Sequence, residues 1–399
     1  MYEIREAKDE DRDSAIRLLW KAHSVTDELE EIRKKDWTKG WHSPKKKDWS
    51  FVAMDGNEVV ANVSFFEDKA NIIRGNPIPF SAVWGVATLP QHRRRGLIRK
   101  LFIESFRSMR ERGMGLSILA PFYKAYYEKF GYSLAEQRVK HEFPRNLLRI
   151  VKGDNSITNR ELTAPSEAKV TQKIEASMSR YGSRNFHTIS TLERMIKENH
   201  YHLFERDSEP VGTAKFYFNQ VKDDVLDLAV HATTFTSIDV LPSIVELVGL
   251  YATNTTTIRW YTEPQVPVRY YMDDLMDWKT VDWSGMMMRA TDIEVYCSSI
   301  RVPSDATESV IIRLNDEMCP WNKGTFRLSP NIGSLEVERL DSSVDPDVSV
   351  DALGLSDIIG GLNPATILRG LGNIECSAQV AENLEAIFPA DSFVSYQRF

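Results

Sequence analysis

Apolar and polar positions switch between two periods along the first part of the chain. Residues 2–6 alternate as a short edge strand does, and the apolar residues between 15 and 22 recur at helical spacing. Residues 51–54 and 59–65 are two apolar, β-branched runs joined by Asp55, Gly56 and Asn57. This junction predicts a β-hairpin, because glycine tolerates the positive φ that a tight turn requires.

The pattern that follows predicts a strand, a helix, a second strand and a second helix. Residues 80–88 form an apolar run that Leu89 and Pro90 close, and an apolar helical face then extends from about Arg94 to Gly113. Residues 115–120 form another buried strand, and the helix that Pro121 starts ends at a glycine cap near Gly131. The predicted order is therefore β, α, β, β, β, α, β, α.

A polar, proline-containing stretch at 142–168 places a domain boundary near residue 150. The pattern then partly repeats, but no arginine-glycine turn precedes the helix of the repeat. From about residue 293, long strands are followed by short helices that glycines interrupt, which indicates a compact α+β domain. The predicted domains are 1–150, 151–290 and 291–399. The repeat is predicted from a strand pair at 211–218 and 225–232, a helix at 241–253 and a strand at 257–261.

Composition narrows the class of protein. With 50 basic and 57 acidic side chains, the formal charge of −7 argues against nucleic acid as a partner. No run of 18 apolar residues is present, so neither a membrane span nor a signal peptide is expected. Cys297, Cys319 and Cys376 stand singly, which fits a cytoplasmic protein, and the histidines lack the paired spacing of a metal site.

The turn between residues 93 and 96 carries the strongest chemical signal. It follows a buried strand and opens an amphipathic helix, whose first N–H groups are unpaired and attract phosphate. Gly96 would let the backbone approach an anion closely, while Arg94 and Arg95 add forked donors. Arg99, one turn later, could face the same group. We therefore expect this turn to hold a pyrophosphate, such as that of coenzyme A.

This stretch resembles the signature of the GNAT acetyltransferases, which is R/Q-x-x-G-x-G/A. Arg93, Gly96 and Ile98 occupy its places, and Ile98 departs from the small final residue. The longer runs GVATLPQHRRRGLIRKL (85–101) and YEKFGYSLA (127–135) are similar to the Eis (enhanced intracellular survival) family of aminoglycoside and lysine acetyltransferases. In that family a bulky residue after the loop is usual.

The resemblance covers the whole chain and implies its fold class. It implies α/β plus α+β architecture: tandem GNAT folds, the second without a pyrophosphate loop, followed by a domain similar to sterol carrier proteins. Cys319 to Gly324 and the later glycine-rich helices support the last domain. It also implies a homo-oligomer, expected to be a hexamer, and acetyl-CoA as co-substrate without a metal.

By the same resemblance, the acetyl-CoA site would be built from two segments and bordered by a third. A splayed strand would offer backbone groups to the pantetheine arm, the turn and helix start would hold the pyrophosphate, and two aromatic residues would border the thioester. The strand residues would be Val86, Ala87 and Thr88, and the aromatic pair Phe122 and Tyr123. The residues of the turn and helix start would be Arg94, Arg95, Gly96, Leu97, Ile98 and Arg99.

The family also implies the catalytic groups. Tyr127 matches the tyrosine three residues before Phe-Gly-Tyr, which protonates the leaving thiolate, and adjacent Tyr126 is the alternative. The terminal carboxylate, here on Phe399, would serve as the base or draw the substrate ammonium into place. Acidic and aromatic side chains should select a cationic amine. The candidates for this role are Asp27, Glu28, Trp37, Trp41 and Trp84.

The predicted function is transfer of an acetyl group from acetyl-CoA to a primary amine of a cationic small molecule, such as an aminoglycoside or a polyamine. Arg398, beside the terminal carboxylate, argues against tight binding of a polycation. One alternative is a protein lysine acetyltransferase. Another is a non-catalytic protein whose third domain binds a lipid or other ligand.

Overall fold

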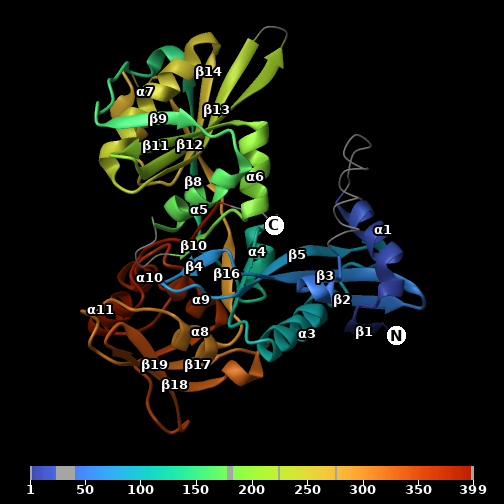
Figure 1. Cartoon of the computed structure of the whole chain (residues 1–399). Helices are drawn as coiled ribbons and strands as arrows, with labels where there is room; N and C mark the ends of the chain where they lie inside the picture. Colours follow the sequence, from blue (N-terminus) through green and yellow to red (C-terminus); the bar gives the residue numbers. More distant parts are fainter. Residues whose placement is uncertain (1, 24–40, 178–182, 223–224, 275, 397–399) are drawn as a thin grey trace.

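The computed structural model describes residues 2–23, 41–177, 183–222, 225–274 and 276–396, which build three bodies joined by a small fourth sheet (Figure 1). The first body is a seven-stranded sheet in the order β1-β2-β3-β5-β6-β16-β7. Its strands are β1 (Glu3–Glu6), β2 (Asp48–Asp55), β3 (Glu58–Asp68), β5 (Phe80–Thr88), β6 (Leu116–Leu119), β16 (Met287–Ala290) and β7 (Ser133–Leu134). Its helices are α1 (Arg12–Ala22), α3 (Leu97–Glu111) and α4 (Lys124–Glu128).

Helices cover both faces of this first sheet. Residues 59–65 of β3 are all buried, so both of the strand's faces must be covered. Helices α1 and α3 both contact β3 and β5 and supply that cover. The turn between β2 and β3 has Gly56 at φ +60°, as the hairpin signal predicts. The contacts of α3 with β3 and β5 place the start of this helix near the end of β5, where the expected site lies.

The second body is a seven-stranded sheet in the order β15-β8-β14-β13-β12-β11-β9. Its strands are β15 (Lys279–Ser284), β8 (Gln137–Pro144), β14 (Thr257–Thr262), β13 (Val225–Phe235), β12 (Glu209–Lys222), β11 (His200–Arg206) and β9 (Ile157–Glu161). Helices α5 (Ala168–Ser177) and α6 (Ile189–Glu198) pack together, and α7 (Leu241–Tyr251) contacts β13. The two sets of helices belong to separate apolar clusters, so they cover different parts of the sheet.

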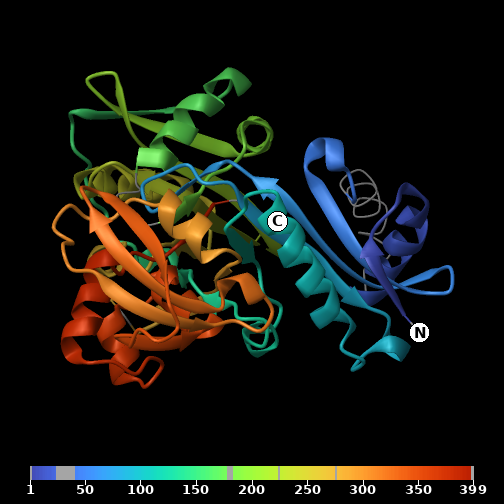
Figure 2. The same cartoon turned by 90° about the horizontal axis from the view of Figure 1, so that it is seen from below.

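The third body has a four-stranded sheet in the order β19-β18-β17-β20. Its strands are β19 (Ser334–Leu340), β18 (Gly324–Asn331), β17 (Val310–Asn315) and β20 (Val348–Asp351). Its helices are α8 (Ile293–Ser299), α9 (Ala352–Gly360), α10 (Ala365–Gly370) and α11 (Ala378–Ile387). Seen from below, this body lies beside the first one, with α3 near their boundary (Figure 2). The expected fold class, with two α/β sheets followed by an α+β unit, is confirmed.

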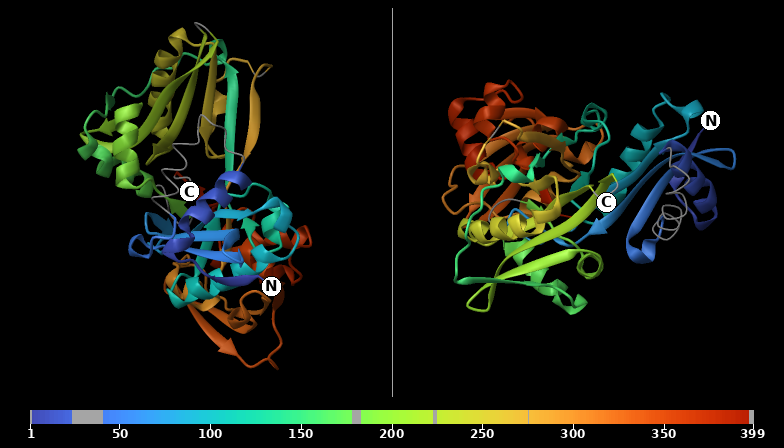
Figure 3. Two further views of the ribbon diagram at one scale, coloured as in Figure 1. Left: turned by 90° about the vertical axis from the view of Figure 1, so that its right-hand side faces the viewer. Right: turned by 90° about the horizontal axis from the view of Figure 1, so that it is seen from above.

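A three-stranded sheet gathers one segment from each part of the chain. It has the order β21-β10-β4, with β4 at Asn71–Ile73, β10 at Ser183–Asn185 and β21 at Val394–Ser395. Strand β10 pairs antiparallel to β4 and parallel to β21. In Figure 1, β4 and β10 lie where the three bodies meet, and Figure 3 shows this arrangement from two other sides.

Two strands cross the expected domain boundaries. Strand β8 was expected in the first domain but belongs to the second sheet, where it pairs with β14 and β15. Strand β16 was expected in the second domain but returns to the first sheet, where it pairs with β6 and β7. Both are buried apolar or alternating strands, and hydrophobic pattern alone does not tell which sheet such a strand joins. The division at residues 150 and 290 stays a prediction.

Glu136 holds the crossing segments together. Its side chain is 2% exposed and its Oε2 accepts a hydrogen bond from the Met286 amide at 2.9 Å. Its Oε1 accepts from the Ser395 amide at 2.7 Å and from Arg138 Nε at 2.7 Å. A buried carboxylate needs such partners, since an unpaired one is costly. One side chain therefore ties the entry to β8, the start of β16 and β21 to one another.

Arg289 links the first sheet to the third body in a similar way. It is fully buried on β16, and its Nη2 lies 2.7 and 2.6 Å from the two carboxylate oxygens of Asp316. Its Nη1 donates to the carbonyl of Phe130, and its guanidinium lies 4.3 Å from the centre of the Phe106 ring. Arg289 thus connects the segment that follows α4 to Asp316 of the third body.

Replacing Gly285 by alanine should destabilise the protein. An added Cβ would lie 2.0 Å from the carbonyl oxygen of Glu136, a backbone atom that cannot move without disturbing this junction. We expect the thermal unfolding midpoint to fall by about 5 °C or more. Gly249→Ala on α7 is the control, because its Cβ would meet only Leu148 Cδ2 at 4.0 Å. It should keep or slightly raise the midpoint, and equal effects of the two changes would contradict the proposed clash.

Candidate active site

Strand β5 departs from regular pairing at the centre of the first sheet. Its parallel register with β6 covers only Ser81 to Val83, so the two strands part beyond that point. On its other side, the register with β3 shifts at Gly85, which has φ +60°. Asn62 Nδ2 donates to the Gly85 carbonyl at 2.8 Å and fixes this bulge. On the β6 side, the backbone of residues 84–88 therefore faces a gap rather than a neighbouring strand, as the splayed strand of the prediction requires.

The turn after β5 positions a helix end beside this gap. A short 3-10 helix at Pro90–His92 precedes the turn, and α3 begins at Leu97. Arg94 has φ +61° and Gly96, the residue that caps α3, has φ +71°. Two left-handed residues within three positions bend the chain so that the first amides of α3 lie at the end of β5. Such a helix start attracts anions.

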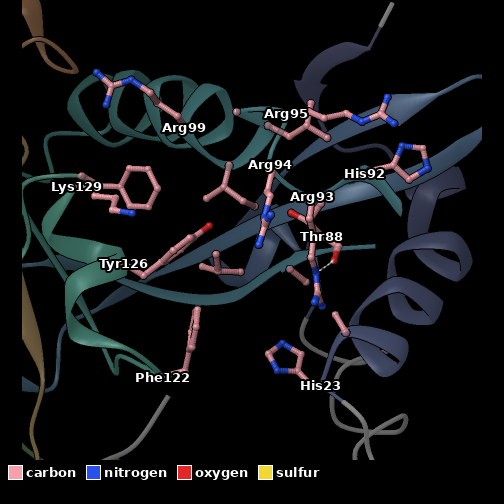
Figure 4. A pocket seen from close by; sticks show the side chains of 17 residues that line it. His23, Thr88, His92, Arg93, Arg94, Arg95, Arg99, Phe122, Tyr126 and Lys129 are labelled. Atoms are coloured by element: carbon pink, nitrogen blue, oxygen red, sulfur yellow. Dashed lines mark hydrogen bonds between the residues drawn. The ribbon is translucent and has the colours of Figure 1, made fainter. Parts of the chain in front are cut away.

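A cavity of about 860 Å³ opens where the splayed strand and the helix start meet (Figure 4). Most of the predicted cofactor residues line it, which brings the two predicted segments together. The predicted residues in its wall are Val86, Ala87, Thr88, Arg94, Arg95, Gly96, Leu97, Ile98, Arg99 and Phe122. A volume of this size suits an extended organic molecule.

The arginine side chains of this turn point in different directions. Arg94 extends into the middle of the cavity in Figure 4. Arg95 instead turns toward Tyr2, whose hydroxyl lies 2.7 Å from its Nη1, and also donates to the Gln91 carbonyl at 3.3 Å. Arg99 lies 3.1 Å from Glu317 in an exposed ion pair. Arg93 also lines the cavity, and its Nε donates to the Thr88 carbonyl at 3.3 Å. Arg94 is therefore the arginine whose charge is most available to a molecule in the cavity.

A narrower cavity of about 250 Å³ lies between the parting strands. Val83 to Val86 of β5 and Leu119 of β6 line it, and Tyr127 and Phe122 close it from the α4 side. Val86 and Phe122 line both cavities, so the narrow one continues the wide one. Burial raises the pKa of Tyr127, with smaller contributions from Tyr126 and Tyr132, which keeps its phenol protonated at neutral pH.

Several predicted residues lie elsewhere. Tyr123 precedes α4 in extended backbone, is 64% exposed and lines neither cavity. Its expected place beside the thioester stays a prediction. Trp41 is fully buried, and its Nε1 donates to Asn62 Oδ1 at 3.0 Å, so it supports the β5 bulge rather than a substrate. Trp84 lines the narrow cavity beside Tyr127.

The other predicted substrate and base residues, Asp27, Glu28, Trp37 and Phe399, lie outside the described residues. The described chain reaches Tyr396, next to β21. Within the described segments, no three histidine, cysteine or acidic residues gather as metal ligands would, and no helix is long and apolar enough to cross a membrane.

The structure adds lining residues that the sequence pattern did not single out. These are Ala22, His23, His92, Lys129 and Phe130, and Tyr126, the alternative acid of the prediction, lines the cavity as well. Lys129 follows α4 and approaches the cavity opposite Arg94, as Figure 4 shows. His92 lies in the 3-10 helix, with its Nδ1 2.8 Å from the Tyr2 hydroxyl. His92 and Lys129 lie inside the two runs that carry the family resemblance, but no role was predicted for either.

Comparison with known proteins separates the chain into two matched regions. Residues 3–135 match the model of the acetyltransferase (GNAT) domain, and residues 294–394 match that of the sterol carrier protein domain. A Streptomyces avermitilis protein described as an uncharacterized N-acetyltransferase is 21% identical over 354 residues, which are 81% of this chain and 82% of that protein.

Solved structures match the complete fold. A probable N-acyltransferase from Enterococcus faecalis aligns over 100% of both chains with a TM-score of 0.83 and 14% identity. A GCN5-related N-acetyltransferase from Anabaena variabilis aligns over 100% of both chains with a TM-score of 0.81 and 15% identity. Eis1 from Mycobacterium abscessus aligns over 100% of both chains, with a TM-score of 0.76 and 17% identity. The arrangement of all three bodies is thus shared with these proteins.

Asp48, the first residue of β2, should make stability depend on pH. Burial raises the pKa of this carboxyl to about 8, and the neighbouring Trp84 and the His42 backbone only partly offset the increase. The folded protein therefore keeps a proton that the unfolded chain releases above about pH 4. Stability should fall between about pH 4 and pH 8, by at most about 1.4 kcal/mol per pH unit.

Asp48→Asn removes this titration without changing the shape of the side chain. The thermal unfolding midpoints of the variant and of wild type are measured across this pH range. The midpoint of the variant minus that of wild type should increase as the pH rises. Asp13→Asn, at an exposed aspartate on α1, is the matched control and should shift little with pH relative to wild type. A constant difference between Asp48→Asn and wild type would contradict the raised pKa.

Proposed function

Because the chain belongs to the GNAT family of N-acetyltransferases and carries a sterol carrier protein domain, we propose that it moves an acetyl group from acetyl-CoA to a primary amine of a cationic small molecule. Aminoglycosides and polyamines are the expected acceptors. The observation that carries this proposal is the gap between β5 and β6, which runs from an anion-binding helix start to a buried tyrosine.

The wide cavity would hold the coenzyme. Its pyrophosphate would lie at the start of α3, where Gly96 allows close approach and Arg94 supplies a charge that extends into the cavity. The backbone of Val86 to Thr88, which has no strand partner on the β6 side, would hydrogen-bond the pantetheine arm. The thioester would then lie at the narrow cavity.

Tyr127 would act as the acid. The amine attacks the thioester carbonyl, a C–N bond forms and the C–S bond breaks, and the departing thiolate takes a proton from the phenol. The nitrogen loses one proton as it becomes an amide, and this proton restores the phenol. Burial raises the pKa of Tyr127, and the same surroundings raise the pKa of a thiol beside it. Because both pKa values rise, the phenol can still donate its proton to the thiolate in this apolar pocket.

The terminal carboxylate would receive the proton of the attacking ammonium or draw that ammonium into place. Strand β21 is anchored by hydrogen bonds from the Phe393 amide to the Ala135 carbonyl at 2.9 Å and from the Ser395 amide to Glu136 at 2.7 Å. Both acceptors follow the helix that carries Tyr127. Three further residues can span at most about 10 Å beyond Tyr396, which limits the base to this neighbourhood.

Substrate selection and assembly complete the proposal. Trp84, beside Tyr127 in the narrow cavity, offers a ring face to a cationic amine, and Asp27 and Trp37 are the further proposed contacts. The homo-oligomer, expected as a hexamer, and the cytoplasmic location stay predictions. They rest on the resemblance of the sequence and on its single cysteines.

Arg94→Gln should weaken coenzyme binding selectively. Loss of one charged hydrogen-bond donor should raise the KM for acetyl-CoA about tenfold while kcat changes little. Arg95→Gln is the matched control, because its guanidinium already contacts Tyr2 and Gln91. It should raise this KM less. A larger effect at Arg95 would contradict the geometry of the turn.

Thiol release from acetyl-CoA tests the function itself. Wild type is measured with polyamines, aminoglycosides and lysine peptides, and Tyr127→Phe should lower kcat by about 100-fold or more. Tyr126→Phe, which removes the neighbouring hydroxyl, is the matched control and should lose far less. A chain extended past Phe399 should lose turnover if the terminal carboxylate acts in the reaction.

The outcomes separate the alternatives. Preference for lysine peptides over small amines would favour a protein acetyltransferase. No turnover with any amine would favour a non-catalytic ligand-binding protein. Full activity of the extended chain would exclude Phe399 as the base, and a larger loss in Tyr126→Phe would assign the acid to the neighbouring residue.

A further inference from the structure

A third cavity, of about 510 Å³, lies in the second body. The parallel register of β13 and β14 ends at Val230 and Trp260, although β13 continues to Phe235. Residues beyond this point on both strands, including His231 and Tyr261, line the cavity. The opening therefore repeats the gap of the first sheet. It has none of the lining residues of the two cavities described above, so it is a separate site.

The connection to the following helix excludes the same ligand. In the first body an arginine-glycine turn precedes α3, whereas here Thr236, Ser237 and a short 3-10 helix lead directly into α7. No glycine or arginine occurs between Phe235 and Leu241. The cavity thus lacks the features that would hold a coenzyme pyrophosphate.

Among the described residues, three lysine and arginine side chains line this cavity, and one of them, Arg138, is already paired with Glu136 at 2.7 Å. Lys215 on β12 and Arg194 on α6 line it, and neither has a carboxylate partner within ion-pair distance in the described part of the chain. The Lys215 ammonium lies 4.0 Å from Met195 Sδ and 5.8 Å from the centre of the Tyr217 ring. A cation in such apolar surroundings is stabilised when an anion joins it.

Glu263 lines the cavity and Glu175 lies nearby, and both carboxylates have partners of their own. Glu175 accepts hydrogen bonds from the His187 amide at 3.1 Å and lies 2.7 Å from its Nδ1. Glu263 accepts from the Tyr396 hydroxyl at 3.0 Å and lies 3.5 Å from Arg184. Burial lowers the pKa of Lys215, while Glu175 acts in the opposite sense and Arg194 adds to the decrease. Positive charge is therefore left available in the cavity.

Three aromatic rings form a continuous apolar stack across neighbouring strands of this wall. Tyr217 on β12 stacks on His231 on β13 with ring centres 5.1 Å apart, and its hydroxyl lies 2.8 Å from His231 Nε2. His231 stacks in turn on Tyr261 of β14 with ring centres 4.0 Å apart. Val394 and Met195 add apolar surface at the edges.

We propose that this cavity is a second ligand site, which binds a small organic anion. Its carboxylate or phosphate group contacts Lys215 and Arg194, and its apolar body lies against the stack of Tyr217, His231 and Tyr261. The site is distinct from the acetyl transfer described above and does not depend on it.

Calorimetric titration of the full chain with four probes tests this proposal. Benzoate and phenyl phosphate carry the anion and an apolar ring, benzamide keeps the ring without the charge, and inorganic phosphate keeps the charge without the ring. Benzoate or phenyl phosphate, or both, should bind with a Kd of about 1 mM or below. Benzoate should then bind about tenfold more tightly than benzamide, or phenyl phosphate about tenfold more tightly than inorganic phosphate. Absence of binding by both ring anions would overturn the proposal, as would equal binding of benzamide and benzoate.

Variants then assign the binding to this cavity. Lys215→Met and Arg194→Gln should each weaken the ring anion about tenfold, whereas Lys215→Arg, which keeps the charge, should bind within a few-fold of wild type. Lys197→Met is the matched control, because Lys197 is exposed on the same helix as Arg194 and does not line the cavity. Thermal unfolding of each variant checks that it is folded.

Wild-type affinity in Lys215→Met would overturn the assignment. So would a ring anion that raises the KM of the amine acceptor in proportion to its concentration, because the cavity would then be part of the acceptor site. Unchanged turnover in the presence of the anion would support a separate site, and this result can be obtained whichever amine is the acceptor.

Discussion

The buried carboxylate of Glu136 is the interaction on which the arrangement of the three bodies depends. It accepts hydrogen bonds from the amides of Met286 and Ser395 and from Arg138, so its charge is compensated within the protein. These donors come from the return of the chain to the first sheet, from β21 and from the start of β8. A buried charge left without them would be strongly unfavourable, which makes their meeting point specific.

The architecture around Glu136 explains why the proposed active site needs more than the first body. Strand β16 completes the sheet that carries the cavity, and Arg289 on it holds the carbonyl at the end of α4. Asp316, from the third body, neutralises that arginine. The position of Tyr127 is therefore determined by residues that the chain places far beyond the matched acetyltransferase domain.

Local signals predicted the parts of the fold that are set by neighbouring residues. The hairpin at Gly56 and the turn at Gly96 both need positive φ, and the sequence shows this directly. The exchange of β8 and β16 between sheets depends on long-range packing, which no short pattern contains. Strands β9 and β11 and helices α5 and α6 were not predicted. In α6 the signal was present, since Ile189, Leu192 and Ile196 recur at helical spacing.

The same distinction applies to the candidate site. The sequence identified the cluster of arginines, but the direction of each side chain depends on competing partners such as Tyr2 for Arg95 and Glu317 for Arg99. Family resemblance placed Tyr123 beside the thioester, whereas in the structure it stands in extended backbone before α4 with 64% of its surface exposed. Lys129 had no motif of its own, and only the folded chain brings it to the cavity.

The small sheet of β4, β10 and β21 has a consequence for how this protein can fold. Its three strands come from distant parts of the sequence, so this sheet contributes contacts of very high contact order that form only after long loops have closed. Before β21 docks, one edge of β10 is unpaired and Glu136 lacks the hydrogen bond from the Ser395 amide. An unpaired strand edge favours association with other chains. The three bodies are thus expected to mature together rather than as independent modules, and fragments cut at the visible boundaries would be prone to aggregate.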